Sequence, residues 1–399
     1  MALATDDNLV KRVRVTMLAA APLNSLASHS PWDVVVIGAG PAGAIAARQL
    51  GLQGKCVLLI DKARMPRDKV CGGCLGGTAL KLLNDIGLGH IPATCEGVRL
   101  KTFELSCGGR KAAVSIGDRI AISRCAFDDA LVREAVRAGV TMRDQTVGRL
   151  APVANDSFRS IIVSDGRDEV TVRATVVVIA TGLAQPPPGF VVQIAPGSPI
   201  GLGAVSQHAP VNVVRTCLHM AYGAHGYVGI TEVERDQFDI AASIYPSALS
   251  QAHSPGRLIQ QLLQESGSRI SMDWEKLHWH GTTRLTRTTT PIGSHRCLLI
   301  GDAAAYVEPF TGEGIGWAMK SGVLAASLLS GNHERWDGSI PSHWERRFAE
   351  TIGVRHKCCS TIGLLMRMKP LRRPVAWGLQ HAPFLSRPVV RLLDRPFTR

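Results

Sequence analysis

Residues 33–61 read DVVVIGAGPAGAIAARQLGLQGKCVLLID, and this stretch decides the fold. The continuous apolar run at 33–37 predicts a buried strand, and the run at 56–60 predicts a second one. Between them, residues from about 42 to 52 have the composition of a helix, which Gly54 ends. A strand, a helix and a strand within about 30 residues predict a β-α-β unit, in which the two strands are parallel neighbours.

The turn between the first strand and the helix is GAGPAG at 38–43, which fits the pattern G-x-G-x-x-G. Gly38 permits the tight turn, Gly40 lets a pyrophosphate approach the backbone, and Gly43 lets the helix pack closely on the strand. The free N–H groups at the helix N-terminus favour phosphate. Asp61 ends the second strand, where its carboxylate can accept hydrogen bonds from ribose hydroxyls. A tight turn without a ligand would need only the glycines, so the combination with Asp61 favours a dinucleotide site.

Residues 301–316 read GDAAAYVEPFTGEGIG and predict a second contact with the same ligand. Asp302 follows a short apolar run, at a place where a carboxylate can meet a sugar-alcohol hydroxyl. A helix is predicted over 318–329, and its start can stabilise negative charge on a reduced flavin. Backbone is exposed before it at Gly312, Gly314 and Gly316. A dehydrogenase that uses nicotinamide alone has no need of this segment. The alternative is a glycine-rich loop before a helix, in which Glu308 and Glu313 make structural hydrogen bonds.

The rest of the chain predicts an α/β protein whose nucleotide-binding domain is discontinuous. Residue alternation predicts strands over 98–120 and a hairpin over 159–178, and the amphipathic pattern predicts a helix over 127–138. The predicted fold class is an FAD-binding Rossmann-like domain, of the β-β-α plus three-layer type, with an inserted, largely β substrate domain and a helical C-terminal segment. The predicted parts are an N-terminal extension at 1–30, the FAD-binding domain at 31–182 plus 296–335, the substrate domain at 183–295, and a basic helical region at 336–399.

The net charge bears on the kind of partner. The chain has 45 Lys and Arg against 32 Asp and Glu, a formal net charge of +13, which favours acidic partners such as a nucleotide cofactor or anionic lipid. Aromatic residues make up only 5% and no nucleic-acid-binding motif is visible, so nucleic acid is not predicted as a partner. The sequence contains no run of 18 or more apolar residues, so no membrane-spanning helix is predicted.

Cysteine usage and the N-terminus bear on localisation. The 10 cysteines show no regular spacing in a long chain, which favours a reduced, cytoplasmic setting over a secreted disulfide scaffold. Lys11, Arg12 and Arg14 precede a short apolar stretch, which resembles a signal sequence, but Pro22 interrupts it. We therefore favour a disordered extension, or a start at Met17, over a signal sequence.

Four segments together resemble the flavoprotein superfamily of para-hydroxybenzoate hydroxylase, and most closely its geranylgeranyl reductase branch. GAGPAG with Asp61 matches the first nucleotide motif, and PRDKVCGG at 66–73 matches a loop that usually reads close to PRDKPCGDGL. SRCAFDDAL at 123–131 matches the segment whose arginine, here Arg124, contacts the cofactor. GDAAAYVEPFTGEGIGWAMKSG at 301–322 matches the segment that holds the ribityl chain and the flavin ring.

The resemblance implies FAD as the cofactor. No separate nicotinamide domain is evident, so the predicted external reductant is NAD(P)H or another carrier, and no metal is predicted. The cofactor-binding residues that the resemblance and the motifs predict are Gly38, Gly40, Ala42, Gly43, Asp61, Lys62, Arg67, Arg124, Gly301, Asp302, Pro309, Gly312, Gly314 and Ile315.

Two departures from the family pattern bear on the electron donor and on the substrate. Ala180-Thr181-Gly182 stands where related hydroxylases and many reductases carry an Asp-Gly pair with a role in NADPH docking. The reductase branch tends to carry Tyr-x-Trp-x-Phe-Pro in the substrate region, whereas residues 221–230 read AYGAHGYVGI, without the Trp or the Phe-Pro. The Trp-x-Trp-x-Ile-Pro string of flavin halogenases is absent from the sequence as well.

Cys71-Gly72-Gly73-Cys74 has the spacing of a CxxC motif. Cys71 matches the single cysteine of the reductase branch's loop, which lies near the flavin, and it is therefore a weak candidate for a catalytic residue. The other interpretations are a redox disulfide, half of a zinc site for which the chain has no second CxxC, and structural packing.

These observations leave three hypotheses for function. The first is an FAD-dependent oxidoreductase that acts on a carbon–carbon double bond of a hydrophobic, isoprenoid-like or lipid-like substrate. The second is an FAD-dependent monooxygenase that tailors an aromatic or polyketide metabolite, and the third is a flavin- or lipid-binding module without catalysis. The C-terminal segment 363–399 mixes apolar residues with eight Lys and Arg and one acid, Asp394. Such a segment either lies on an anionic membrane surface or packs on the core as a cap.

Overall fold

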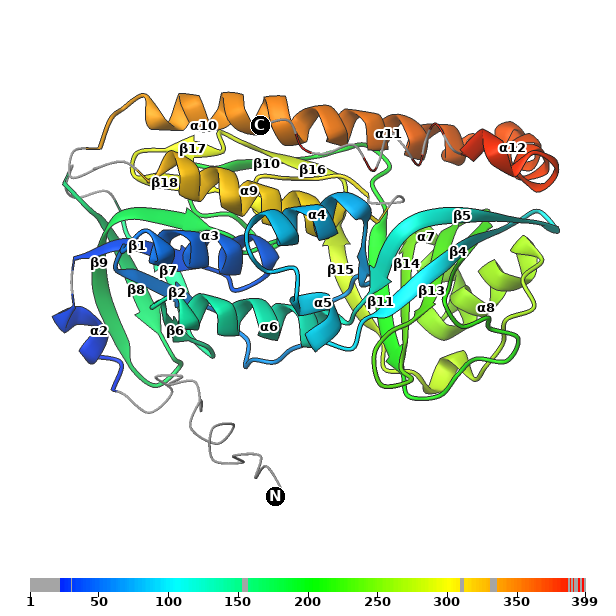
Figure 1. The fold of residues 1–399 in the computed structure, drawn as a ribbon, viewed down its shortest axis with the longest axis horizontal. Coiled ribbons are helices and arrows are strands. Elements are labelled where there is room, and N and C mark those ends of the chain that lie inside the picture. The colour runs from blue at the N-terminus through cyan, green and yellow to red at the C-terminus, as the bar shows by residue number, and fades with distance from the viewer. Residues whose placement is uncertain are drawn as a thin grey trace, which may run out of the picture.

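The computed structural model describes residues 22–29, 31–152, 157–308, 312–330 and 336–386, and the single residues 388, 390, 394 and 397. Most of the predicted extension at 1–30 lies outside these residues, although Ser25–Ser28 form a short helix, α2. The described chain folds into two large sheets and one small sheet with helices packed around them (Figure 1).

The first large sheet carries the predicted β-α-β unit. Its main path runs β17-β18-β9-β1-β2-β6, and the pairs between β18 and β6 on this path are parallel. β7 and β8 extend it as antiparallel partners next to β9. The bounds are β1 Trp32–Ile37, β2 Val57–Ile60, β6 Thr141–Arg143, β7 Val147–Leu150, β8 Arg159–Ser164, β9 Glu169–Ile179, β17 Gly293–Ser294 and β18 Cys297–Leu299. Distant segments thus build one Rossmann-like sheet, and the predicted fold class is confirmed.

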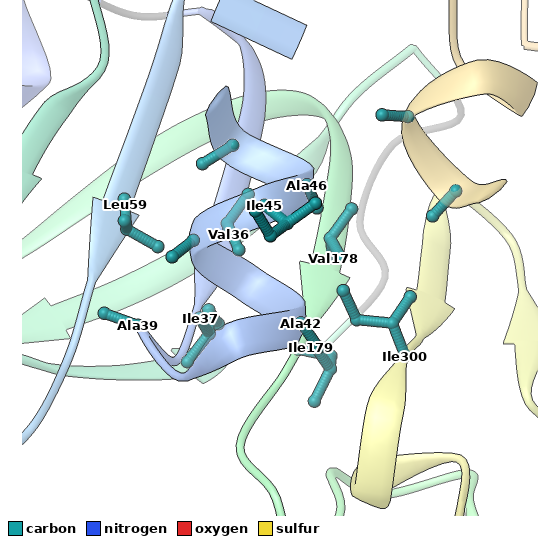
Figure 2. Packing of buried hydrophobic residues seen from close by; sticks show 14 of the residues in the cluster. Val36, Ile37, Ala39, Ala42, Ile45, Ala46, Leu59, Val178, Ile179 and Ile300 are labelled. Carbon is teal, nitrogen blue, oxygen red and sulfur yellow. The ribbon is translucent and has the colours of Figure 1, made fainter. Parts of the chain in front are cut away.

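Helix α3, Pro41–Leu52, packs its small apolar residues on this sheet. Figure 2 shows Ile45 and Ala46 of α3 beside Val36 of β1 and Val178 of β9. Full burial of a side chain such as Ile45, which is 0% exposed, contributes about 1.5–3 kcal/mol to stability. On its other sides α3 contacts α6, Arg124–Arg137, and α9, Gly314–Leu328. A Cβ at Gly322 of α9 would lie 2.4 Å from the Ala42 carbonyl oxygen, so a larger residue there would force α9 away from α3.

The second large sheet forms the platform of the inserted region. Its strands run in the order β15-β11-β14-β13-β12-β4-β5-β3. The bounds are β3 Cys74–Leu75, β4 Val98–Cys107, β5 Arg110–Ala121, β11 Ile200–Ser206, β12 Cys217–Gly223, β13 Gly226–Glu232, β14 Phe238–Ile244 and β15 His280–Arg284. Helices α7, Pro246–Ala252, and α8, Pro255–Ser266, belong to the apolar cluster on one face of this sheet.

This sheet divides the chain differently from the predicted boundary of the FAD-binding domain. Residues 98–121 were assigned to that domain within 31–182, but β4 pairs in parallel with β12 and β5 pairs with β4. The segment therefore belongs to the platform sheet. The alternation at 98–120 correctly indicated strands, but alternation does not identify the partner of a strand.

The third sheet and the C-terminal helices complete the fold. The order of the small sheet is β10-β16-β19, with β10 at Val191–Ile194, β16 at Arg287–Thr290 and β19 at Ala305–Tyr306. Shorter helices α4, Gly77–Asp85, and α5, Ile91–Thr94, follow the loop after β2. At the top of Figure 1, α10, α11 and α12 follow one another toward the platform sheet. They span Ile340–Phe348, Val354–Arg367 and Lys369–His381. Within the part of the chain that the structure describes, no helix is long and apolar enough to cross a membrane.

Candidate cofactor site and adjoining cavity

A cavity lies between the first large sheet and the platform sheet, with about 1360 Å³ of space free of protein atoms, open solvent included. One wall comes from the turn after β1, the loop before β3, and the segment around the N-terminus of α9. The opposite wall comes from β11, β12, β13 and β14. Among the predicted residues, those that line the cavity are Gly40, Ala42, Cys71, Arg124, Asp302, Gly312, Gly314 and Ile315.

The three glycines of the turn after β1 meet different constraints. Gly38 has φ +108°, and a Cβ there would lie 2.4 Å from the Ala180 carbonyl oxygen. A Cβ at Gly43 would lie 1.9 Å from the Gly38 oxygen. At Gly40 the nearest atoms to a Cβ would be two guanidinium nitrogens, each 3.7 Å away, which is ordinary contact. Protein packing therefore requires glycine at Gly38 and Gly43 but not at Gly40, whose bare backbone faces the cavity.

Asp61 shapes the same turn through two hydrogen bonds. The backbone N–H of Ala39 donates to Asp61 Oδ2 at 2.8 Å, and the N–H of Ala63 donates to Oδ1 at 2.9 Å. The side chain is 8% exposed, at the end of β2. Each carboxylate oxygen can accept a further bond, so the position remains suitable for a ribose hydroxyl. Lys62, the next residue, is exposed and is not part of the cavity wall.

Two arginines converge on Gly40 and share one carboxylate. Arg124 donates from Nε and Nη2 to the two oxygens of Asp128, both at 2.8 Å. Arg67 Nη1 lies 3.1 Å from Asp128 Oδ2 in an ion pair, without the geometry of a hydrogen bond. Asp128 is 0% exposed. Burial would lower the pKa of Arg124, but the charge and hydrogen bonds of Asp128 outweigh it and raise that pKa, so the guanidinium stays charged.

Lys69 and Asp302 face each other across this part of the cavity. Burial lowers the pKa of the Lys69 ammonium, and the charge of Arg124 lowers it further while Asp302 opposes this. Burial raises the pKa of Asp302, and Lys69 and Arg124 act against that rise. Many protein atoms surround Lys69, yet its side chain is exposed, because it lines the open cavity. A ligand that replaces water there would strengthen each of these interactions.

The segment after β18 brings the start of α9 to the cavity. Gly301 has φ +57°, and its N–H donates to Ser321 Oγ at 2.8 Å. Helix α9 begins at Gly314, four residues before the predicted start at 318. Gly314 and Ile315 line the cavity, so the free N–H groups of the first turn of α9 lie at the cavity wall. Pro309 lies outside the described residues.

The glutamates of this segment make structural hydrogen bonds. Ser243 Oγ of β14 donates to Glu308 Oε1 at 2.5 Å, which ties the segment to the platform sheet. Thr78 Oγ1 donates to Glu313 Oε2 at 2.9 Å. Burial raises the pKa of Glu313, and the bond from Thr78 acts against that rise.

The two cysteines of the CxxC spacing differ in environment, and both are free thiols. Cys71 lines the cavity and interacts with the Arg124 guanidinium. Burial raises the pKa of Cys74 to about 12, which disfavours the thiolate that a redox dithiol needs. In the described residues no group of three or more His, Cys, Asp or Glu side chains is placed to hold a metal ion.

The platform sheet gives the cavity a floor of three rows, which the strand register defines. The middle row is bare, because Gly229 of β13 pairs with Met220 on one side and with Ala241 on the other. One end row contains Tyr227 and Ser243, and the other contains Thr231 and Asp239. All seven of these side chains or backbones line the cavity, together with Leu218. The floor is thus mostly apolar in the middle and polar at both ends.

The residues present fit FAD by their own geometry. Gly40 leaves backbone open beside two cationic side chains, and Arg67 Nη1 is buried without a hydrogen bond of its own. A pyrophosphate would supply the hydrogen-bond acceptor that Arg67 Nη1 lacks, and its negative charge would be matched by the two guanidinium groups. A family model described as an FAD binding domain matches residues 31–186 of the chain.

The chain carries an FAD-binding domain that is similar to that of the para-hydroxybenzoate hydroxylase superfamily.

Curated relatives of this flavoprotein include several reductases. Menaquinone reductase of Mycobacterium tuberculosis is 28% identical over 86% of this chain and 86% of its own length. Digeranylgeranylglycerophospholipid reductase 2 of Methanococcoides burtonii is 25% identical over 81% of each chain. Conditioned medium factor receptor 1 of Dictyostelium discoideum is 26% identical over 79% of this chain and 67% of its own length. The resemblance to the geranylgeranyl reductase family, the FAD-binding fold and FAD as cofactor are thereby confirmed.

Solved structures agree with the fold of the flavoprotein. A flavin-dependent brominase superposes with a TM-score of 0.74 at 20% identity, over 91% of this chain and 93% of its own. A flavoprotein/dehydrogenase of Cytophaga hutchinsonii superposes with a TM-score of 0.67 at 15% identity, over 91% and 98%. At these identities the likeness concerns the fold alone.

Three site residues did not emerge from the sequence. Asp128 carried a usable signal, since it stands four residues after Arg124 in a predicted helical segment, where opposite charges pair. Lys69 stands inside the quoted loop PRDKVCGG but was not distinguished from its neighbours. Asp239 carried no signal, because one acid at the start of an ordinary strand sequence reads as a solvent-facing residue.

Proposed function

We propose that this FAD-dependent oxidoreductase reduces a carbon–carbon double bond of a hydrophobic, isoprenoid-like or lipid-like substrate, or catalyses the reverse oxidation. The observation that supports this most is the continuity of one cavity from the turn at Gly40 to the apolar part of the floor at Met220 and Ala241. Two of the relatives are named as reductases, of menaquinone and of a digeranylgeranylglycerophospholipid.

The chain's own residues bind and orient the reactants. The Gly40 turn and the paired arginines Arg67 and Arg124 bind the pyrophosphate, and Asp61 accepts from the ribose. The N-terminus of α9 would contribute partial positive charge to the bound cofactor, and the platform sheet would exclude water from this part of the cavity. Bound FAD supplies the two-electron transfer to or from a substrate carbon. We propose NAD(P)H as the external electron donor.

An anaerobic reduction experiment tests the reaction. The flavoprotein is reduced with dithionite and mixed with menaquinone or with an unsaturated archaeal ether lipid in detergent. The molecular mass of the extracted product is then measured by mass spectrometry. A gain of one molecule of hydrogen per double bond, with reoxidation of the flavin, supports the proposal. Free FAD with dithionite is the control, because it reduces quinone rings without the protein.

The same preparation separates the alternatives. Oxygen uptake that depends on an aromatic substrate and yields a hydroxylated product would overturn the proposal in favour of a monooxygenase. Reduced flavin that reacts with neither oxygen nor any unsaturated lipid at a rate above free flavin would favour a binding module. Neither alternative is supported by a particular contact in the cavity.

We further propose that the C-terminal helices bring the enzyme to an anionic membrane surface, where such a substrate resides. Ala376 of α12 is fully buried in a cluster with Leu105, Met220 and Tyr227, so α12 covers the far end of the platform sheet. On the same helix Val375 is 38% exposed and Trp377 is 52% exposed. The other large apolar side chains exposed in this part of the chain are Val354, Leu364, Met368 and Phe384. Apolar side chains within a strongly basic segment match an anionic bilayer in both respects.

A further inference from the structure

Asp239 is a buried acid on the cavity wall that the binding of FAD does not use. It is the second residue of β14, where it pairs with Thr231 of β13 and with Val205 of β11. Its exposed fraction is 7%, and it lines the cavity. A Cβ built on Gly73 would lie 3.1 Å from Asp239 Oδ2, so the carboxyl group lies against the loop that carries Cys71.

Within the described part of the chain, the Asp239 carboxyl group makes neither a hydrogen bond nor an ion pair. Glu234, an acid in the turn before β14 whose charge acts on Asp239, accepts from the Ser123 N–H at 2.9 Å. The carboxyl group lines the cavity, where a bound ligand can supply the hydrogen bond that the described protein does not supply. The position therefore favours a ligand contact over a structural role.

The surroundings keep Asp239 in its neutral form. Burial, together with the negative charges of Asp68 and Glu234, raises its pKa to about 8, and Arg124 acts in the opposite direction. At neutral pH the group is therefore a carboxylic acid with one O–H to donate. A neutral acid in an apolar site donates to an uncharged oxygen and disfavours an anion.

We propose that Asp239 donates a hydrogen bond to an uncharged oxygen, such as a ketone or ester carbonyl, of the molecule that lies over β13 and β14. The ligand class is then an apolar body with a carbonyl group. The body lies over the bare middle row, where Gly229 and Ala241 leave space, and its carbonyl lies at the Thr231 end. The inference deepens the proposed function and rests on it, because it takes this part of the cavity as the substrate's place.

Two probes of one shape test the inference in the FAD-loaded protein with oxidised flavin. The probes are 2-acetylnaphthalene, which has the carbonyl, and 2-ethylnaphthalene, which lacks it, and binding is followed by calorimetry and by the perturbed flavin spectrum. Asp239→Ala is expected to weaken the ketone about tenfold, or about 1.4 kcal/mol, and to leave the hydrocarbon unchanged. Asp239→Asn keeps an N–H donor and is expected to retain most of the ketone's affinity. Asp236→Ala, at an exposed position of the preceding turn, is the matched control and should change neither.

The pH dependence gives a second readout. Wild-type protein should lose ketone affinity between about two units below and about two units above the pKa of Asp239, whereas Asp239→Asn should show no such loss. If both probes bind and Asp239→Ala affects them equally, the role of Asp239 is wrong while the cavity remains a hydrophobic site. If neither probe binds to the wild type, both the inference and the assignment of the cavity to a hydrophobic substrate are contradicted.

Discussion

Replacing Gly40 by alanine should separate cofactor binding from folding. Gly40 has φ −74° and ψ −178°, which alanine adopts without strain, and its new Cβ would meet only guanidinium nitrogens at 3.7 Å. In the apo-protein the substitution should therefore be neutral or stabilise by about 0.4–1 kcal/mol, because it restricts the unfolded chain. The added methyl group occupies the approach of the pyrophosphate. Loss of one hydrogen bond to a charged group costs about 1.5–3 kcal/mol, so the Kd for FAD should rise about 10- to 100-fold.

Gly43→Ala is the matched comparison, three residues along the same turn. Its Cβ would lie 1.9 Å from the Gly38 carbonyl oxygen, so α3 must shift and the apo-protein should lose about 1–3 kcal/mol or more. Urea unfolding of both apo-variants and fluorescence titration with FAD measure the two effects. Unchanged FAD affinity in Gly40→Ala would refute the reasoning, and so would equal destabilisation of the two variants.

Three further predictions concern charge, pH and the membrane. Asp128→Asn removes the carboxylate that Arg67 and Arg124 share, so the free energy of unfolding of the apo-protein should fall by about 3 kcal/mol. Bound FAD should restore part of this loss, and urea titrations with and without FAD measure both effects. A change below about 0.5 kcal/mol would contradict the shared ion pair. Burial lowers the pKa of His356 to about 4, so the folded protein binds fewer protons than the unfolded chain between that value and about 6.5. The free energy of unfolding of the wild type should thus rise as the pH rises from about 4 to about 6.5, by up to about 3 kcal/mol relative to His356→Gln. Parallel pH profiles of the two proteins would count against this. Trp377→Ser should reduce flotation with phosphatidylglycerol vesicles, whereas phosphatidylcholine vesicles should bind neither protein; equal flotation of both proteins would remove the role of α12.

The sequence predicted best what short-range physics determines. The β-α-β unit at 33–61 follows from apolar runs and from glycines at fixed offsets, and the structure has β1, α3 and β2 within one or two residues of the predicted bounds. The start of α9 was predicted four residues late, because its first turn consists of glycine-rich sequence that has low helix propensity. Its helical start at Gly314 depends on contacts with the rest of the fold.

The pairing of strands that are far apart in the chain could not be predicted from the sequence. The strands at 98–121 were recognised as strands, but their place in the platform sheet depends on pairing with β12, more than 100 residues away. Asp239 becomes notable only when the Cys71 loop and β14 are brought together, which the local sequence of neither segment indicates. Asp128 differs from these, since the four-residue spacing from Arg124 was available in the sequence.

Release of the bound cofactor tests the central claim most directly. Purified protein is denatured, and the flavin set free is identified and counted by chromatography; the apo-protein is then offered FAD or FMN. We predict about one FAD per chain, and apo-protein that rebinds FAD but not FMN, which lacks the pyrophosphate that Gly40, Arg67 and Arg124 are arranged to hold. Protein that releases no flavin and takes up none, or that prefers FMN, would contradict the account.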